Sequence, residues 1–401
     1  MLHIRNWVLL TLIILIPQGL FGAEDAKKPP HKTVCLNMIV KNESAVITRC
    51  LESVLPLIDY WVISDTGSTD GTQQIIKDYM KEKKIPGELH EKPWRNFAHN
   101  RNEAMHLAKG KADYIMFIDA DEFISYDDDF TLPALDKDYY YFVLTWPGSQ
   151  WKKISLINNH LDWEWVGVLH EVIAPPASRT FGTIEKMRNN YTVDGARSKD
   201  PKKYEKDAEV LEAALKDEPN NTRYMFYLAQ SYANAGNKEK AIEWYKRRAD
   251  VTWDNDTEAF LSLLKIAILQ EELNMPSDVV IASYKKACTY MRTRAEPYYH
   301  LARYYRSLGD NERCYLVACI GKTIPLPDDL LWVEEWMYDY GLLMEISVSS
   351  YWIGKYKECQ EASAAMLKQQ NLPDNFRECA ESNLGFANAK LLEQVCNQEA
   401  A

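Results

Sequence analysis

The pattern of hydrophobic and polar residues changes near the middle of the chain. In the first half, short apolar runs rich in β-forming residues, such as 33–40, 60–64 and 114–118, alternate with stretches whose apolar residues recur at helical spacing. This alternation predicts an α/β domain over residues 32–197, with a mainly parallel, Rossmann-like sheet covered by helices on both faces. The helical stretches are 44–58, 72–83 and 96–110.

After residue 201 only helical patterns follow. Ala229 is followed seven residues later by Gly236, and Ala302 by Gly309, in segments that share aromatic, Leu-Ala and Tyr positions. Ala267 falls between them, 38 residues after the first alanine and 35 before the second. A period in the middle thirties with small residues at helix contacts is typical of tetratricopeptide repeats. We therefore expect an all-α tetratricopeptide-like solenoid over residues 201–398, in which most aromatic side chains pack between helices.

The N-terminus has the pattern of a targeting segment. His3 and Arg5 precede the apolar run 7–16, and small residues follow up to Ala23. The run is shorter than the roughly 20 residues that span a bilayer. We expect residues 1–23 to be a signal peptide or, failing cleavage, an anchor. The protein would then lie in a secretory-pathway lumen or be tethered to a membrane, and a cytoplasmic location is the alternative.

Composition narrows the class of protein further. The 401 residues carry a formal net charge of −11, which argues against nucleic acid as a partner because phosphate binding needs clustered Lys and Arg. The eight cysteines include no C-x-x-C pair, so neither a zinc ribbon nor a disulfide framework is indicated. If the chain is exported, Cys314 could pair with Cys319 and Cys359 with Cys379.

Two polar motifs follow predicted strands, where ligands bind in parallel α/β sheets. The first is the segment DTGSTDGT, residues 65–72. Asp65 ends a strand and can accept a hydrogen bond from a base or a ribose, while Gly67 and Gly71 permit a tight turn near a ligand. The alternative is purely local: Ser68, Asp70 and Thr72 would cap the following helix.

The second motif is DADE, residues 119–122. Asp119 and Asp121 are separated by one residue, so at an extended strand end their side chains point the same way. Two such carboxylates can hold Mn²⁺ or Mg²⁺, and the cation can bridge a diphosphate. Glu122 faces the other way and is expected to be structural. The alternative for the whole motif is a solvated acidic turn.

These motifs also carry a resemblance. The segments NMIVKNESAVITRCLESVLPLIDYWVISDTGSTDGT, RNFAHNRNEAM and IMFIDADEF resemble family 2 glycosyltransferases of the GT-A fold. The segments WVGVLHEVI and LEAALKDEPNNTRYMFYLAQSYANAGNKEKAIEWY resemble bacterial-type members with a tetratricopeptide-like C-terminal half. The resemblance implies a metal-dependent transfer of a hexosyl or N-acetylhexosaminyl group. The donor would be a nucleotide-diphospho-sugar, usually a UDP-sugar, and the acceptor a hydroxyl of a glycan or protein, typically with inversion.

The resemblance also implies residue roles, motif by motif. Glu171 matches a candidate general base, for which a structural contact between two strands is the alternative, as it is for His170. Trp163 and Trp165 could stack on a sugar ring, although core packing is the preferred interpretation. Thr66 stands where many relatives have a second Asp. The implied nucleotide-sugar-binding residues are Asn42, Glu43, Asp65, Arg101, Asn102 and Asp119, and the implied metal ligands are Asp121, Asp119 and His170.

Two other functions compete with glycosyl transfer. One is a tetratricopeptide adaptor whose N-terminal half binds a nucleotide sugar without transferring it. The other is a nucleotidyltransferase, which is disfavoured because the glycine-containing loop is acidic rather than basic. Whether the protein is a glycosyltransferase or an adaptor, its helical repeats could bind a partner protein or mediate self-association.

Overall fold

The computed structural model describes residues 31–147, 149–174, 180–251, 253, 256–327 and 332–399. The expected targeting segment, residues 1–23, lies outside this part of the chain. The described residues from 32 onward form one compact unit. None of the helices in the described ranges is long and apolar enough to cross a membrane.

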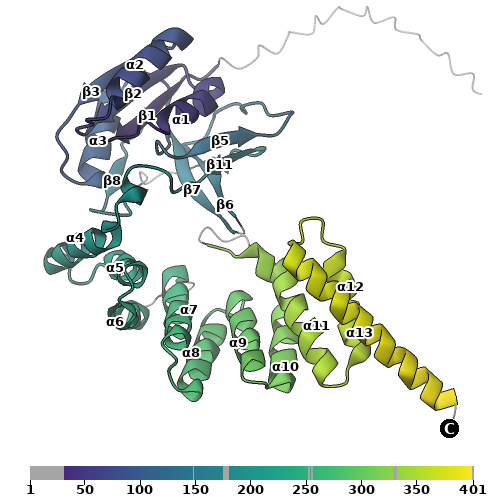
Figure 1. Cartoon of the computed structure of the whole chain (residues 1–401). Helices are drawn as coiled ribbons and strands as arrows, with labels where there is room; N and C mark the ends of the chain where they lie inside the picture. Colours follow the sequence, from purple (N-terminus) through teal and green to yellow (C-terminus); the bar gives the residue numbers. More distant parts are fainter. Residues whose placement is uncertain are drawn as a thin grey trace, which may run out of the picture. The chain divides into compact units, whose positions relative to one another are not determined.

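The first half of the compact unit is a mixed, mostly parallel α/β structure, as the alternating pattern predicts (Figure 1). Its main sheet has the strand order β3-β2-β1-β4-β7-β6-β11-β5, with β10 paired to β6, while β8 and β9 form a separate hairpin. The strands are β1 (Val34–Val40), β2 (Tyr60–Asp65), β3 (Gly87–Glu91), β4 (Tyr114–Phe117), β5 (Phe123–Tyr126), β6 (Tyr139–Trp146), β7 (Ser149–Asn158), β8 (Glu164–Val166), β9 (Val172–Ala174), β10 (Phe181–Thr183) and β11 (Met187–Asn190).

Helices cover both faces of this sheet. Side chains of β1 alternate between the faces, so Leu36 and Met38 pack in one cluster with Ile47, while Cys35 packs in another with Met105. The first cluster contains residues of α1 and α2, and the second contains residues of α3. The bounds are α1 (Ile47–Val54), the 3₁₀ turn η1 (Leu55–Leu57), α2 (Thr72–Lys83) and α3 (Phe97–Leu107).

The strand order creates a switch point beside β1. This strand pairs in parallel with β2 on one side and with β4 on the other. The connection from β1 to β2 runs through α1 on one face of the sheet, and the connection from β3 to β4 runs through α3 on the other. Ligands of parallel α/β sheets bind beyond the carboxyl ends of the strands at such a point. Asn42 and Asp119 follow β1 and β4, and Asp65 is the last residue of β2. The topology therefore collects the predicted polar motifs at one edge.

The second half consists of helices packed in successive pairs (Figure 1). The three alanines of the repeat pattern, Ala229, Ala267 and Ala302, are completely buried. The bounds are α4 (Lys203–Asp217), α5 (Thr222–Asn234), α6 (Lys238–Asp250), α7 (Thr257–Glu272), α8 (Ser277–Tyr290), α9 (Glu296–Ser307), α10 (Asn311–Lys322), the π-turn η3 (Met337–Gly341), α11 (Leu342–Trp352), α12 (Tyr356–Leu367) and α13 (Asp374–Glu399). The 3₁₀ turn η2 (Arg197–Lys199) precedes them.

Left-handed residues end the first helix of each pair. Gly236, Gly309 and Gly354 have φ of 85°, 78° and 78°. Asn274 occupies the same place after α7, seven residues beyond Ala267, with φ of 52°. Glycine and asparagine are the residues that adopt this conformation at least cost, which explains the seven-residue spacing seen in the sequence.

Two local expectations are wrong. Helix α2 is capped by Gly71 in the left-handed conformation without a side-chain cap, although Asp70 accepts hydrogen bonds from the backbone N–H and hydroxyl of Thr72. The suggested cysteine pairs are also absent, since all eight cysteines are free thiols. Cys314 and Cys319 lie on one helix, α10, and Cys314 instead contacts Glu345 of α11.

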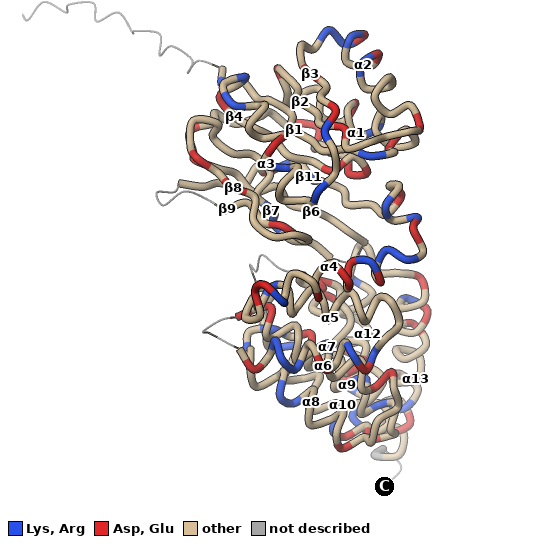
Figure 2. The backbone as a smooth tube through the Cα atoms, turned by 90° about the vertical axis from the view of Figure 1, so that its left-hand side faces the viewer, with Lys and Arg blue, Asp and Glu red and all other residues tan. Residues whose placement is uncertain are grey.

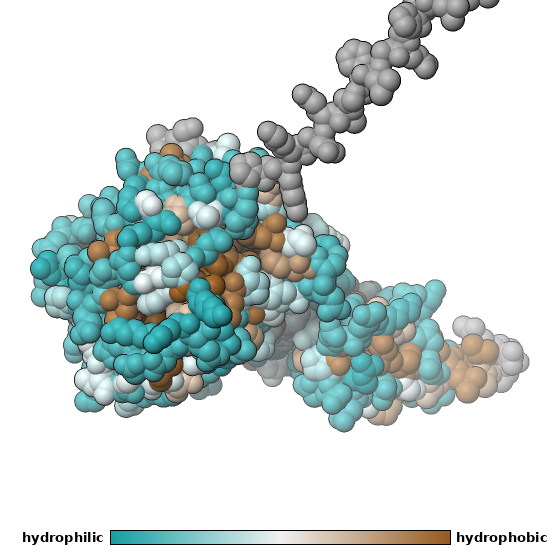
Figure 3. All heavy atoms as spheres, turned by 90° about the horizontal axis from the view of Figure 1, so that it is seen from above, coloured by the Kyte–Doolittle hydropathy of each residue, from teal (hydrophilic) through white to brown (hydrophobic). Residues whose placement is uncertain are grey.

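The surface carries a segment of mixed charge and, elsewhere, exposed hydrophobic side chains. Basic and acidic residues are interleaved along the segment that leads into α4, as Figure 2 shows. On the face seen in Figure 3, hydrophobic residues gather between hydrophilic ridges. The large hydrophobic side chains exposed around the α/β half include Trp94, Trp146, Val166, Val172 and Phe181.

The left-handed turn after α9 supplies a stability test. No atom lies within 4 Å of a Cβ built on Gly309, so Gly309→Ala adds backbone strain without a clash. We expect a cost of about 1 kcal/mol and a melting temperature lower by about 2 °C. Gly309→Asn is the matched control, because asparagine already stands at the equivalent position 274. Equal losses in both variants, measured by thermal unfolding, would contradict this explanation.

Candidate functional site

A buried arginine connects two of the predicted acidic residues. Arg101 lies on α3 and is only 8% exposed. Its Nε donates to Oε1 of Glu171 at 2.5 Å, and its terminal nitrogen donates to Oδ1 of Asp119 at 2.6 Å. Burial alone would lower the pKa of Arg101, but the two carboxylates raise it overall. The guanidinium therefore remains charged and fixes both carboxylates in orientation.

Asp119 has a second cationic partner. Lys153, on β7, places its Nζ 3.3 Å from Oδ2 of Asp119. Burial would raise the pKa of Asp119, yet Arg101 and Lys153 together lower it below its usual range. Both oxygens of this carboxylate are thus paired with protein cations.

Asp121 has the opposite environment. No ion pair to its side chain is found among the residues that the structure describes. Burial and the nearby Asp119 raise the pKa of Asp121. Its Oδ2 lies so near the backbone of Gly195 that a Cβ there would be 2.6 Å away. Glycine at 195 therefore leaves room for a carboxylate that makes no ion pair in the described ranges and is only weakly influenced by Lys203.

Glu122 is structural, as the sequence predicts. Its side chain is buried and accepts a hydrogen bond from Nδ2 of Asn189 at 2.7 Å. It also accepts from the backbone N–H of Asp119 at 3.3 Å. Glu122 therefore fixes the turn that carries the other two acids.

Asp65 has one oxygen engaged and one without a partner. Its Oδ1 accepts hydrogen bonds from the backbone N–H groups of Gly67 and Ser68, at 2.9 and 2.8 Å, and from Nε2 of Gln73 at 3.0 Å. Its Oδ2 is buried without a hydrogen-bond partner in the described part of the chain. Leaving such an acceptor unpaired is costly, so this position suits a ligand that donates an N–H or O–H.

The residues after β1 contact the same loop. Asn42 has φ of 58°, and its side-chain oxygen accepts from the backbone N–H of Thr69 at 2.8 Å. The backbone N–H of Glu43 donates to the hydroxyl of Thr72 at 2.9 Å, and its carboxylate accepts from the N–H of Ala196. These contacts place Asn42 and Glu43 beside the Asp65 loop, at the carboxyl edge of the sheet.

His170 and Glu171 lie in the turn of the β8–β9 hairpin. His170 has φ of 52°, and its ring stacks on Tyr227 of α5 with centroids 3.9 Å apart. Arg223 donates to the backbone oxygen of His170 at 3.0 Å. The His170 side chain is partly accessible to solvent, but many protein atoms surround it. Their desolvation of the ring is the largest cause that lowers the pKa of His170 to about 3, and the positive charges of Arg197, Arg223 and Lys203 add to it. His170 is therefore neutral at pH 7, with a nitrogen lone pair able to bind a metal.

Asn102 and the two tryptophans are engaged within the protein. Asn102 donates to the backbone oxygen of Trp165 and accepts from its N–H, both at 2.8 Å, which ties α3 to β8. Trp165 and Trp163 are 3% and 7% exposed and pack against Phe117 and Tyr139. Core packing of both tryptophans is confirmed, and nucleotide contact by Asn102 stays a prediction.

The predicted metal ligands do not form a complete site for a divalent cation without a phosphate group. Within the described ranges, no three His, Cys, Asp or Glu side chains form a group that could hold a metal ion by themselves. Mg²⁺ and Mn²⁺ at diphosphates need only one or two carboxylates, because phosphate oxygens and waters complete the coordination. Asp121, whose carboxylate makes no ion pair in the part of the chain described, fits this requirement best. The set of Asp121, Asp119 and His170 stays a prediction.

Two basic residues of the site were not predicted. Lys153 stands among alternating polar and apolar residues of β7, which indicate a strand but not that Lys153 faces Asp119. Lys203, in the first turn of α4, acts electrostatically on both Asp121 and His170. Both contacts join segments far apart in the sequence, so local pattern carries no sign of them.

The environment of Glu43 supplies a test by pH. Burial raises the pKa of Glu43 to about 7, with Asp121 adding to the rise and the Ala196 hydrogen bond opposing it. A raised carboxyl pKa means that folding favours the protonated form, so stability is lost as pH rises from about 4.5 to about 7. The free energy of unfolding of Glu43→Gln, relative to that of wild type, should therefore be about 2 kcal/mol higher at pH 8 than at pH 5.

Urea unfolding in EDTA at both pH values measures this gain. Exposed Glu52→Gln is the control and should show no such pH-dependent difference. A constant difference between Glu43→Gln and wild type at both pH values would contradict the raised pKa.

Comparison with known proteins finds a family match within the α/β half. Residues 35–165 match the model of glycosyl transferase family 2. The SPbeta prophage-derived glycosyltransferase SunS of Bacillus subtilis (strain 168) is 25% identical over 238 residues, which are 55% of this chain and 54% of the relative. The chain thus spans about half the length of this relative.

The helical half is similar to repeat proteins. The TPR repeat-containing protein Synpcc7942_0270 of Synechococcus elongatus is 37% identical over 90 residues, 22% of this chain and 20% of that protein. Among solved structures, MamA covers 51% of this chain and 98% of its own, with 16% identity and a TM-score of 0.33. A tetratricopeptide repeat protein from Parabacteroides merdae covers 48% and 73%, with 14% identity and a TM-score of 0.37.

The tetratricopeptide character of the second half follows from its own helix pairs and repeat spacing. For the first half, the strand order, the strand-end acids and the family match agree with one another. Residues 35–165 belong to a domain of glycosyl transferase family 2.

Proposed function

We propose that the protein is a metal-dependent glycosyltransferase that moves a hexosyl or N-acetylhexosaminyl group from a UDP-sugar to an acceptor hydroxyl, with inversion. One observation carries the proposal. Arg101 joins Asp119, at the end of β4, to Glu171, in the β8–β9 turn. A carboxylate of the donor-binding edge is thereby held next to a carboxylate able to act as a base. The match to family 2 over residues 35–165 supports this interpretation.

The donor nucleotide would bind beyond β1 and β2. The unpartnered Oδ2 of Asp65 is suited to accept a hydrogen bond from the N–H of a uracil ring. Asn42 and Glu43 border the same loop and would contact the nucleoside. The diphosphate would then extend toward Asp119 and Asp121, with Arg101 near it.

Asp121 is the residue best suited to hold Mn²⁺ or Mg²⁺, with His170 as a further ligand. When bound, the cation would neutralise the diphosphate and make it a better leaving group. Asp119, already paired with Arg101 and Lys153, would orient the donor. Lys203 would add positive charge on the side of α4.

Glu171 would act as the general base. Its carboxylate takes the proton from the acceptor hydroxyl as the hydroxyl oxygen forms a bond to the anomeric carbon. The bond between that carbon and the diphosphate oxygen breaks, and UDP leaves with the electron pair. The ion pair with Arg101 fixes the direction of the Glu171 carboxylate, which a single displacement requires.

The acceptor would be a glycan or a protein, and the helical repeats could bind it, bind another protein or mediate self-association. Residues 1–23 would place the enzyme in a secretory lumen or on a membrane. A lumen that supplies activated sugars suits this chemistry.

Release of UDP from a panel of UDP-sugars with Mn²⁺ tests the proposal. We expect measurable release by the wild-type chain, and a loss of at least about a hundredfold in the double variant Asp119→Asn/Asp121→Asn, because charge stabilisation at the leaving group is removed. The double variant Asp127→Asn/Asp128→Asn, on the following exposed loop, is the matched control and should keep wild-type turnover.

The controls also separate the alternatives. Calorimetric binding of UDP without turnover on any acceptor would favour the adaptor function. Unchanged turnover in the Asp119/Asp121 double variant would show that the proposed metal and donor role of these residues is wrong.

A further inference from the structure

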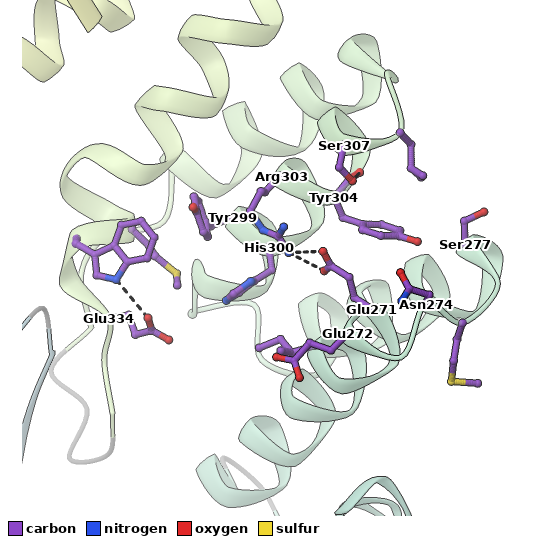
Figure 4. Close-up of a pocket in the computed structure, with 15 residues that line it drawn as sticks. Glu271, Glu272, Asn274, Ser277, Tyr299, His300, Arg303, Tyr304, Ser307 and Glu334 are labelled. Atoms are coloured by element: carbon purple, nitrogen blue, oxygen red, sulfur yellow. Dashed lines mark hydrogen bonds and ion pairs between the residues drawn. The ribbon is translucent and has the colours of Figure 1, made fainter. Parts of the chain in front are cut away.

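A pocket lies in the helical half. It has a volume of about 780 Å³, within the usual range for small-molecule sites. Its walls come from α7, the turn into α8, α9 and the segment around η3. Figure 4 shows the ring of His300 between Glu334 on one side and Glu272 on the other.

His300 carries unused hydrogen-bonding capacity in this pocket. Neither ring nitrogen has a hydrogen-bond partner in the described part of the protein, and both atoms are shielded from solvent. The ring itself is well packed, stacked parallel to Tyr284 with centroids 6.0 Å apart and edge-on to Tyr299 at 5.4 Å. Two unsatisfied polar atoms on a packed ring cost stability, and a ligand hydroxyl that reaches the ring as the lining side chains move aside would relieve part of that cost.

Each of the three carboxylates that line the pocket lies near a cationic side chain. Glu271 accepts from Arg303 at 2.6 Å through both oxygens. Glu272 pairs with Lys238 at 2.9 Å. The third carboxylate, Glu334, accepts from the indole N–H of Trp336 and is attracted by Lys265. The cations near these carboxylates offset part of the negative charge of the pocket, and burial raises the pKa of Glu334, so the pocket is not built to hold an anion.

Aromatic rings border these polar groups. Tyr299, Tyr304 and Trp336 line the pocket, and Trp336 packs edge-on to Tyr299 with centroids 4.9 Å apart. A pyranose ring has an apolar face of C–H groups and a rim of hydroxyls that both donate and accept. Aromatic walls beside polar side chains match that surface.

We propose that this pocket is a binding site for a neutral carbohydrate, separate from the donor site of the α/β half. His300 recognises ligand hydroxyls through its ring nitrogens, and the aromatic walls contact the sugar face. A short peptide is the competing occupant, and the test below distinguishes the two. This site goes beyond the proposed glycosyl transfer and does not depend on it, because binding is measured without turnover.

Saturation-transfer difference NMR on the full chain tests the site. The probes are the methyl glycosides of glucose, galactose, mannose and N-acetylglucosamine, with excess UDP present. We expect a signal from at least one glycoside that falls at least about fivefold in His300→Phe, which keeps the ring contacts and removes both nitrogens. The signal should persist in Asp121→Asn, which separates this result from failure of the proposed transferase.

Controls make the result decisive. His160→Phe replaces an exposed histidine of the α/β half and should leave the signal unchanged. The melting temperature of His300→Phe should equal or exceed that of wild type, because no protein hydrogen bond is lost. If this variant fails to fold, the half-exposed Glu272→Ala serves in its place and should also weaken the signal.

Three outcomes would overturn the proposal. They are the absence of any glycoside signal, an undiminished signal in both pocket variants, and a His300-dependent signal from Gly-Ser-Gly or Gly-Tyr-Gly tripeptides but from none of the glycosides.

Discussion

The ion pairs of Arg101 with Asp119 and Glu171 are the constraint on which the site depends. They join α3, the end of β4 and the β8–β9 turn, which are separated along the chain. Buried charges are expensive unless paired, and removing one partner typically costs about 3–5 kcal/mol. The Arg101 side chain thus holds the sheet edge beside the hairpin, together with the hydrogen bonds of Asn102 to Trp165. The hairpin turn in turn contacts α5 through His170 and Tyr227, so the helical half also borders the site.

Three acidic residues that are adjacent in sequence have three different environments. Asp119 is neutralised by Arg101 and Lys153, and Glu122 is buried against Asn189. Asp121 has no ion pair in the described ranges, and burial and the nearby negative charge of Asp119 raise its pKa. The negative charge of Asp119 therefore acts on both Asp121 and Glu122, and a cation bound at Asp121 would relieve the repulsion there.

The sequence predicts the elements and the strand-end acids well, because both depend on local pattern. Period-two and helical spacing locate the strands and helices, and parallel strands deliver Asp65 and Asp119 to a common edge. The seven-residue spacing from Ala302 to Gly309 predicts a repeat because a left-handed turn is needed after each first helix. Periodicity cannot show which distant side chains meet. Lys153 reaching Asp119, Gly195 lying against Asp121 and the unpartnered nitrogens of His300 all arise from tertiary packing.

The most direct measurement is the affinity for Mn²⁺ in the presence of UDP, determined by electron paramagnetic resonance titration of the two single variants. Asp121→Asn removes the carboxylate that makes no ion pair within the described residues, so we expect affinity to fall by about a hundredfold or more. Asp119→Asn removes a carboxylate already paired with Arg101 and Lys153, so we expect a loss of about tenfold or less. Wild-type affinity in Asp121→Asn, or a larger loss in Asp119→Asn, would contradict this division of roles.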